Sequence, residues 1–417
     1  MAEQVIIERL GAKADGIAET DGGHVFVPYT LPGETVEIER EDSRGRLLRV
    51  AQESPEREMP FCPYFGECGG CATQHMREDF YRAWKRDTLV KTLQHARIDT
   101  PIEAMIDAHG EGRRRVTLHV RFPEGVMQVG YMAARSHHVV TIDHCPIAVP
   151  ALKHHAPIVA RAIGEHLKAG RKPLDIQVTA TLSGLDVDIR GHGPMKDKDR
   201  LRLVDLAADL DLARLSLHGD IVVERRPPAI MMGRASVIPP PGSFLQATER
   251  GEQAMAALVV EACARAKRVA DLFSGCGPFA LRLAERSEVH AVETDKGSVA
   301  SLDKAARMTQ GLRRVTVEAR DLFRRPLLTP ELNAFDAVVI DPPRAGAEAQ
   351  ARQIAASKVP LVVSISCDAA TFARDAAILI SSGYQLERIV PVDQFKYSSH
   401  LEVVGVLRKS GKKPSAR

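Results

Sequence analysis

The chain has 417 residues, of which 44% are hydrophobic, and these values exclude both a single small domain and a disordered chain. Lys and Arg number 57 against 54 Asp and Glu, so a polyanionic partner would need a local basic surface rather than the net charge of +3. The sequence contains no apolar run near the ~20 residues of a membrane span, and its first residues lack the pattern of a signal peptide. We therefore expect two or three packed domains in the cytoplasm.

Residues 1–53 predict an all-β module. Short alternating runs such as TVEIER are separated by turns that contain Gly and Pro, the pattern of a small antiparallel barrel. Residues 54–240 begin with a polar linker and continue with an amphipathic helical pattern near 77–94 and strand-like segments such as GRRRVTLHVR. This part predicts an α+β domain that ends at the Pro-Pro-Pro-Gly break at 239–242.

Residues 241–409 alternate apolar strands with amphipathic helices, including helices near 347–357 and 369–380. Such alternation predicts a parallel sheet with helices on both faces, whose ligands bind beyond the carboxyl ends of the strands. The expected fold class is therefore α/β, with a Rossmann-like domain after the barrel and the α+β domain. Residues 410–417 form a basic tail.

A glycine-containing loop follows the first strand of this region, where the sequence reads DLFSGCGPF from Asp271. Gly275 and Gly277 would let the backbone approach a ligand closely. Glu293 ends the next strand, 22 positions after Asp271, where a carboxylate can accept hydrogen bonds from ribose hydroxyls. These features predict a nucleoside-containing cofactor, either NAD or S-adenosylmethionine.

Three later strand ends carry reactive side chains. Asp341 opens an Asp-Pro-Pro-Arg turn, and because methyltransferases of exocyclic amines use similar turns, it leaves the acceptor open. Cys367 follows an apolar strand at the start of a helix whose dipole favours a thiolate, although single cysteines in apolar strands are often core residues. Glu402 begins the last strand and offers a carboxylate for proton removal.

These side chains fit one chemical problem. Carbon 5 of uracil is a poor nucleophile until a group adds to carbon 6, and a thiolate is suited to that addition. We expect Cys367 to attack carbon 6, carbon 5 to accept the methyl group, and Glu402 to remove the carbon 5 proton before Cys367 is eliminated. A paired uridine cannot reach such a thiolate, so the target should be unpaired or flipped out, with Phe244 or Phe395 available to stack on it.

Nearly the whole chain resembles the bacterial RNA 5-methyluridine methyltransferases. The segments that carry the resemblance are FLQ at 244–246, DLFSGCGPF at 271–279, VE at 292–293, DPPRAG at 341–346, SCDAATFARD at 366–375 and DQFKYSSHLE at 393–402. The resemblance implies a class I methyltransferase domain with Cys367 as the nucleophile and Glu402 as the base. The residues expected around the cofactor and target are Gln246, Phe273, Gly275, Gly277, Pro278, Glu293, Asp321 and Asp341.

Two positions depart from the family pattern. The family commonly has Ser-Cys-Asn-Pro at the nucleophile, whereas Asp368 and Ala369 follow Cys367 here. An acidic neighbour tends to raise the pKa of a thiol. Pro278 replaces a commonly polar residue in the cofactor loop.

Four of the seven cysteines are candidate metal ligands. Cys62, Cys68 and Cys71 have the spacing C-x5-C-x2-C, and Cys145 can supply a fourth sulfur. Four thiolates suit either an iron-sulfur cluster or zinc, and the residues alone do not choose between them. The family resemblance implies a [4Fe-4S] cluster.

The first module resembles a TRAM domain, a barrel of the oligonucleotide-binding type. Such barrels bind nucleic acid through basic grooves and exposed aromatic side chains. The candidate RNA contacts are Phe26, Tyr29, Arg44, Arg46 and Arg49 in the barrel, and Arg113, Arg114, Arg115, Arg121 and Arg135 beyond it. The alternative for each is an ordinary solvated surface.

The leading interpretation is an S-adenosylmethionine-dependent RNA uracil-C5 methyltransferase that acts as a monomer, without a membrane or a protein partner. The cluster and the barrel favour large-subunit 23S ribosomal RNA, by resemblance only. The alternatives are transfer RNA as the substrate, an amine methyltransferase that does not use Cys367, and a noncatalytic RNA-binding protein.

Overall fold

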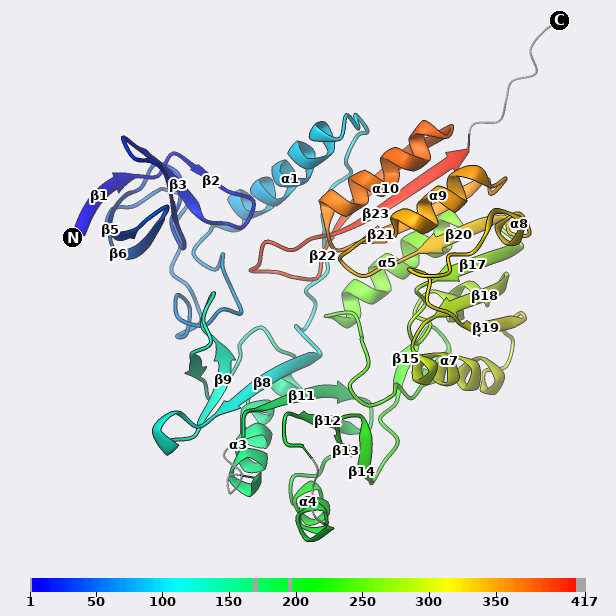
Figure 1. The fold of residues 1–417 in the computed structure, drawn as a ribbon, viewed down its shortest axis with the longest axis horizontal. Coiled ribbons are helices and arrows are strands. Elements are labelled where there is room, and N and C mark those ends of the chain that lie inside the picture. Colours follow the sequence, from blue (N-terminus) through cyan, green and yellow to red (C-terminus); the bar gives the residue numbers. More distant parts are fainter. Residues whose placement is uncertain (1, 168–171, 194–196, 410–417) are drawn as a thin grey trace, which may run out of the picture.

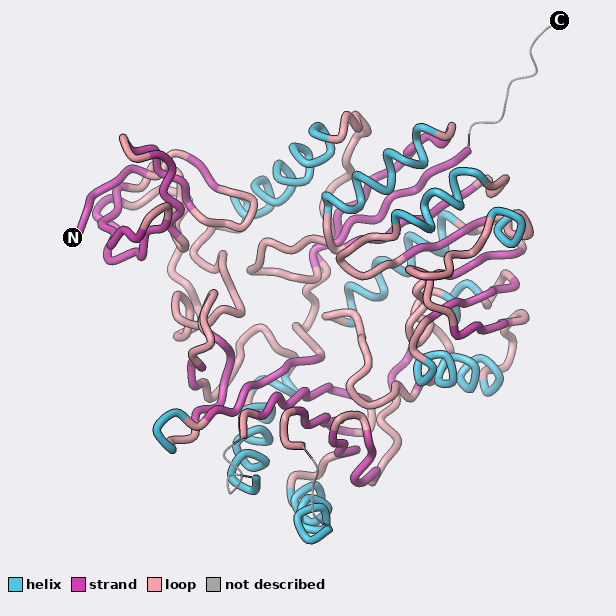
Figure 2. Tube along the Cα trace, in the orientation of Figure 1, coloured by secondary structure: helices cyan, strands magenta, loops and turns pink. Residues whose placement is uncertain are grey.

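The computed structural model describes residues 2–167, 172–193 and 197–409, and the predicted basic tail at 410–417 lies outside them. An N-terminal curled sheet, a central sheet and a large C-terminal sheet follow one another along the chain (Figure 1). Figure 2 shows that the connection between the first two units is mostly loop. Within the described residues, every helix is too short or too polar to span a membrane.

The N-terminal unit is a six-stranded curled sheet, which agrees with the predicted β module. Its strands are β1 (Ala2–Ile6), β2 (Arg9–Leu10), β3 (Gly16–Thr20), β4 (Gly23–Val27), β5 (Thr35–Glu41) and β6 (Arg44–Gln52). They lie in the spatial order β1-β5-β6-β4-β3-β2. Strand alternation places Val25, Val27, Val36 and Ile38 on the inner face, where they form the core of the unit.

The central unit is a seven-stranded sheet with helices on one face. Its elements are β8 (Arg115–Arg121), η1 (Pro123–Gly125), β9 (Gln128–Met132), β10 (Val139–Thr141), α2 (Pro150–Lys153), α3 (His155–Leu167), β11 (Leu174–Thr181), β12 (Gly184–Arg190), α4 (Asp197–Asp209), β13 (Arg214–Leu217) and β14 (Asp220–Glu224). Val116, Leu118 and Val120 of β8 pack on the same side as α3. The opposite face meets the C-terminal unit, because Arg115 donates a hydrogen bond to the carbonyl of Ser243 over 2.8 Å.

The hairpin of β15 (Ile230–Met232) and β16 (Ala235–Val237) leads into the C-terminal unit. The strands of its sheet are β17 (Arg268–Leu272), β18 (Glu288–Glu293), β19 (Val315–Ala319), β20 (Ala337–Ile340), β21 (Leu361–Ser366), β22 (Tyr384–Asp393), β23 (Glu402–Lys409) and β7 (Ile106–Asp107). They follow the order β19-β18-β17-β20-β21-β23-β22-β7. The strands from β17 to β21 are parallel and β23 is antiparallel to β21. The order reverses between β17 and β20, which is where parallel sheets bind ligands.

Helices cover both faces of this sheet, as the sequence predicts. They are α5 (Glu249–Ala262), α6 (Ala280–Leu283), α7 (Lys296–Met308), α8 (Thr329–Leu332), α9 (Glu348–Ala356) and α10 (Ala369–Ser381). One core includes side chains of α5, α6 and α7, and the other includes side chains of α9 and α10. The segment after the glycine loop forms only the short helix α6. The backbone turns away after Leu283, where the amide of Arg286 donates a hydrogen bond to the carbonyl of Leu283.

Two early elements pack onto the late sheet. The helix predicted near 77–94 is α1 (Glu78–His95), whose Leu89 and Leu93 belong to the same core as Phe372 of α10. Strand β7 extends the sheet beside β22. Both elements precede the central sheet in sequence but join the C-terminal sheet in space. The predicted domain boundaries, which follow the sequence alone, therefore stay a prediction.

A buried ion pair fastens α1 to the loop that follows β22. The Lys85 ammonium donates to Asp393 Oδ1 over 2.7 Å and to the carbonyl of His400 over 2.7 Å. The Tyr81 hydroxyl donates to Asp393 Oδ2 over 2.6 Å. Burial lowers the pKa of Lys85 to about 8 and the Asp393 carboxylate opposes this shift. The pair therefore joins two segments that are distant in sequence.

Replacing Lys85 should destabilise the protein. Lys85→Met leaves the Asp393 carboxylate buried without its cation and should lower the free energy of unfolding by about 3 kcal/mol, measured by urea titration. Lys91→Met, at an exposed position of the same helix, is the control. Equal stability of the Lys85 variant and the wild type would contradict the assigned role of the pair.

Candidate active site

The carboxyl ends of the parallel strands line a cavity of about 670 Å³, within the usual range for a small-molecule site. The predicted site residues on its wall are Gln246, Phe273, Gly275, Pro278, Glu293, Asp321, Asp341, Cys367 and Glu402. Phe244 and Phe395, the aromatic residues expected to stack on the target, also line it. The structure thus brings together residues from six separate sequence motifs.

The two glycines of the cofactor loop differ in their surroundings. Gly275 lines the cavity, and a Cβ atom there would meet no atom within 4 Å. Gly277 is not part of the cavity wall; its φ is +92°, and a Cβ atom would lie 2.3 Å from Leu302 Cδ1. Gly277 therefore permits close packing between the loop and α7, while Gly275 leaves open space beside the cavity.

Backbone amides hold the acidic residue at the end of β18. The Glu293 carboxylate accepts hydrogen bonds from the amides of Gly275 over 3.0 Å, Thr294 over 2.6 Å and Asp295 over 2.9 Å. Asp321 similarly accepts a bond from the amide of Phe323 over 3.0 Å. These bonds orient both carboxylates at the cavity wall.

A chain of side-chain hydrogen bonds crosses the cavity wall. Gln246 donates to Asp341 Oδ2 over 3.2 Å. The Gln394 amide nitrogen donates to Gln246 Oε1 over 2.7 Å and to Glu402 Oε1 over 2.9 Å. Sequence reasoning missed Gln394 as a site residue, although it lies in the DQFKYSSHLE segment that carries the family resemblance.

The cavity disfavours negative charge. Burial raises the pKa of Glu402 to about 7, and the hydrogen bond from Gln394 opposes this shift. Burial, followed by the charge of Glu402, raises the pKa of Asp341 well above its ordinary value. Burial and the Glu402 and Asp341 carboxylates raise the pKa of Cys367 to about 11, while Arg344 lowers it. A positively charged ligand would therefore favour the ionised forms of all three groups.

The acidic residue after Cys367 is a helix cap. Asp368 Oδ1 accepts hydrogen bonds from the amides of Ala370 over 3.0 Å and Thr371 over 3.1 Å at the start of α10. The largest neighbouring charges that raise the pKa of Cys367 are instead those of Glu402 and Asp341. The departure from the family pattern thus keeps the capping function that an Asn would have.

The four candidate ligand cysteines gather around a separate cavity of about 70 Å³, which Cys62, Cys68, Cys71 and Cys145 all line. The amide of Gly70 donates to Cys68 Sγ over 3.4 Å. Their side chains do not converge on one point: across the described part of the chain, no three His, Cys, Asp or Glu side chains are placed to hold a metal ion.

Several of the arginines proposed to contact RNA have partners within the protein. Arg46 and Arg49 pair with Glu39 and Glu37 on the barrel. Arg114 is buried and donates to the carbonyl of Gln246 and to Glu252, so its expected RNA contact is wrong. Arg114 lies at a bend just before β8, and its side chain, like that of Arg115, points to the segment at 243–252 of the C-terminal unit.

Arg115 and Arg121 also have partners. The guanidinium carbon of Arg115 lies 5.3 Å from the centre of the Phe244 ring, which lines the active-site cavity. Arg121 pairs with Asp175 on β11 over 2.9 Å. Among the candidate RNA contacts, Arg115 therefore lies beside an aromatic residue of the active-site cavity.

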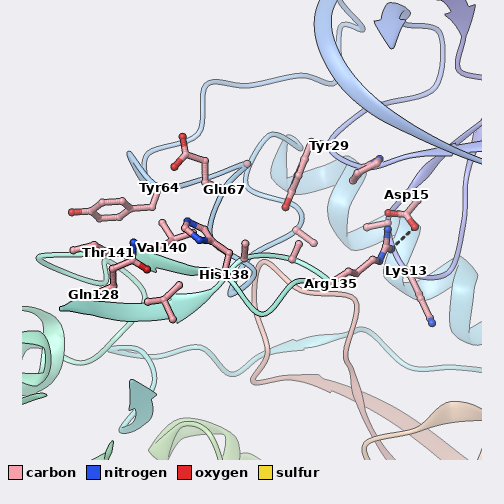
Figure 3. A pocket seen from close by; sticks show the side chains of 17 residues that line it. Lys13, Asp15, Tyr29, Tyr64, Glu67, Gln128, Arg135, His138, Val140 and Thr141 are labelled. Atoms are coloured by element: carbon pink, nitrogen blue, oxygen red, sulfur yellow. Dashed lines mark hydrogen bonds and ion pairs between the residues drawn. The ribbon is translucent and has the colours of Figure 1, made fainter. Parts of the chain in front are cut away.

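A second cleft of about 760 Å³ lies between the barrel and the central unit (Figure 3). Tyr29 of the barrel and Tyr64 of the cysteine segment, residues 61–72, line it. Arg135 also lines it and pairs across the cleft with Asp15 over 2.6 Å. Two predicted RNA contacts, Tyr29 and Arg135, thus come from different units to one cleft.

The C-terminal sheet has the class I methyltransferase fold. A solved structure with a TM-score of 0.75 and 21% identity, the tRNA (uracil-54, C5)-methyltransferase of Pyrococcus abyssi in complex with S-adenosyl-L-homocysteine, covers 97% of this chain and 99% of its own. At that identity the likeness shows the fold. The TRAM domain model matches residues 3–49, which confirms the predicted barrel type.

The tRNA (uracil-5-)-methyltransferase family model matches residues 134–410, and the chain belongs to this family of RNA 5-methyluridine methyltransferases. An uncharacterized RNA methyltransferase of Mesorhizobium japonicum is 47% identical over 98% of both chains. The 23S rRNA (uracil(1939)-C(5))-methyltransferase RlmD of Halomonas elongata is 34% identical over 96% of this chain and 88% of its own. The protein is therefore an S-adenosylmethionine-dependent RNA methyltransferase.

The cap after the nucleophile predicts a stability difference between two substitutions. Asp368→Ala removes both capping bonds and should cost about 1 kcal/mol in the free energy of unfolding, whereas Asp368→Asn, with an equally good capping side chain, should leave it nearly unchanged. Chemical denaturation of both variants and the wild type measures this. An Ala variant as stable as the wild type would show that the cap contributes nothing.

Proposed function

We propose that the protein methylates carbon 5 of a uridine in 23S ribosomal RNA, through a covalent bond between Cys367 and carbon 6. The observation that carries this proposal is the placement of Cys367 and Glu402 on the wall of one cavity, at the sheet edge where class I methyltransferases bind their cofactor. The ribosomal substrate rests on the relation to the Halomonas elongata enzyme.

S-adenosylmethionine supplies a methyl group on a positively charged sulfonium. Glu293 fits the ribose, since its carboxylate is fixed by three backbone amides. Gly275 and Pro278 leave room beside it, and Phe273 and Asp321 complete that part of the wall. The cavity disfavours negative charge, so it suits a cationic ligand.

The proposed reaction uses the side chains in sequence. The Cys367 thiolate adds to carbon 6, and the electrons of the double bond move towards carbon 5. Carbon 5 then accepts the methyl group as the bond between that group and the sulfonium sulfur breaks, which would leave S-adenosyl-L-homocysteine. Glu402 removes the carbon 5 proton, the double bond forms again, and the bond from carbon 6 to sulfur breaks. Gln246 and Asp341 are positioned to bind the polar edge of the uracil ring, because both line the cavity beside the two reacting side chains.

Transfer RNA is the second candidate substrate. The name of the matching family model and that of the Pyrococcus abyssi structure specify transfer RNA. The relation to the Halomonas elongata enzyme, which covers 88% of that enzyme and has the higher identity, favours ribosomal RNA.

We also propose that the four cysteines hold a [4Fe-4S] cluster, with zinc as the alternative. Cys62, Cys68, Cys71 and Cys145 offer four sulfur ligands around one small cavity, and an amide already donates to one sulfur.

The cleft between the barrel and the central unit is proposed to bind an unpaired part of the RNA. Tyr29 and Tyr64 offer ring faces on which bases can stack. Lys13 and Arg135 can contact phosphates, although Asp15 and Glu67 line the same cleft and offset their charge. Binding there would rest on stacking more than on charge.

The nucleophile is tested with unmodified ribosomal RNA and methyl-labelled S-adenosylmethionine. The wild type should form labelled 5-methyluridine by nucleoside mass spectrometry, and Cys367→Ala should form none, because carbon 5 is then never activated. Cys263→Ala, at a buried site outside the cavity, is the matched control and should keep activity. Label on another base, or in the Cys367 variant, would favour an amine methyltransferase, and label only in transfer RNA would change the substrate.

The cluster is tested by metal analysis of protein purified without oxygen. We expect about four iron atoms and four sulfides per chain, and Cys71→Ser should lose them while Cys263→Ser retains them. One zinc per chain without iron would replace the cluster by a zinc site.

A further inference from the structure

Gln394 is a fully buried amide immediately after β22, and each of its polar atoms has a partner. Its nitrogen donates to Gln246 Oε1 over 2.7 Å and to Glu402 Oε1 over 2.9 Å. Its oxygen accepts a bond from the amide of Thr248 over 3.4 Å. The side chain thus uses both N–H groups on two residues of the active-site wall.

The surroundings allow this side chain one orientation. A rotated amide would place its oxygen against Gln246 Oε1 and Glu402 Oε1, which accept but do not donate, so two contacts would become repulsive. Packing is also tight, since a Cβ atom on Gly251 would lie 2.7 Å from Gln394 Cβ. The preceding residue, Asp393, is fixed by its ion pair with Lys85.

We propose that Gln394 is a positioning residue for Glu402, and that its amide holds the Glu402 carboxylate ionised and directed at the carbon 5 proton. This inference rests on the proposed function, in which Glu402 is the base. It adds a residue that acts through Glu402 and does not itself touch the substrate.

The surroundings of Glu402 explain why such a residue is needed, because burial raises its pKa and so disfavours the ionised form. Two other acidic groups of the cavity, Asp341 after β20 and Cys367 after β21, have pKa values that the charge of Glu402 raises. The nearby Lys85 ammonium is engaged by Asp393 and by the carbonyl of His400. Arg344 approaches His400 Nδ1 at 3.1 Å. The Gln394 donor is the contact that opposes burial and keeps the pKa of Glu402 near 7.

The reaction predicts what happens when that donor is lost. After methyl transfer, carbon 5 carries both the methyl group and a proton, and the base must take the proton before the bond between carbon 6 and Cys367 can break. If Glu402 is protonated, the methylated RNA remains bonded to the enzyme. A weaker base should therefore accumulate this covalent adduct, whereas a general packing defect would not.

The test variant is Gln394→Met, which keeps an unbranched side chain of similar length but has no amide. We expect kcat at neutral pH to fall about 10- to 100-fold, the loss typical of one hydrogen bond to a charged group. The KM for S-adenosylmethionine should stay unchanged, and an adduct that survives denaturing gel electrophoresis should accumulate. Gln385→Met, at an exposed position of β22, the strand that precedes Gln394, is the matched control.

The pH dependence gives the sign of the effect. The base works ionised, so kcat should rise with pH through the pKa of Glu402, about 7 in the wild type. Loss of the Gln394 donor raises that pKa, so the midpoint should move to higher pH and activity should recover there. Gln394→Glu keeps the shape and adds a negative charge, so it should move the midpoint further in the same direction, and it serves as the test if the Met variant does not fold.

Two outcomes separate this inference from the proposed function. A wild-type midpoint in the folded Gln394 variants would overturn the positioning role while leaving Glu402 as the base. Glu402→Gln should trap the adduct; if it turns over normally, Glu402 is not the base and the proposed mechanism fails first.

Discussion

The buried ion pair between Lys85 and Asp393 is the contact on which the arrangement of the active site depends. It joins α1 to the end of β22, and the loop that begins at Asp393 ends at Glu402. Substitution of either residue would leave the charge of the other buried and unpaired, which costs more than the pair itself contributes. The helix therefore constrains the position of a side chain more than 300 residues later.

The same burial that fixes these residues sets the chemistry of the cavity. Asp341, Cys367 and Glu402 all have raised pKa values, chiefly because burial disfavours their charged forms, and the Glu402 carboxylate raises the pKa values of Asp341 and Cys367 further. A cation in the cavity would lower the pKa values of all three groups. The sulfonium of S-adenosylmethionine carries such a charge, so in the proposed mechanism cofactor binding would favour the Cys367 thiolate.

The sequence was sufficient to predict residues whose position follows from a strand end. Asp341 and Cys367 each follow an apolar strand of a parallel sheet, and such ends share one edge. Gln394 could not be found this way, since its partners come from two segments, one at 246–248 and one at Glu402. The packing of α1 against α10 could not be predicted either. An amphipathic pattern indicates that one face of a helix is buried, but it does not indicate which element covers that face.

The cysteine segment lies between the two regions that the RNA is proposed to occupy. Residues 61–72 form turns without helix or strand, so backbone pairing does little to hold them in place. Tyr64 of this segment lines the cleft beside the barrel, and the amide of Ala72 donates to the carbonyl of Tyr397 over 2.7 Å, within the loop that precedes Glu402. A metal cluster bound by Cys62, Cys68 and Cys71 would fix the segment as a crosslink does, because ligand bonds replace the missing secondary structure. A cluster there would hold the proposed RNA cleft and the loop before Glu402 in register, without taking part in the proposed methyl transfer itself.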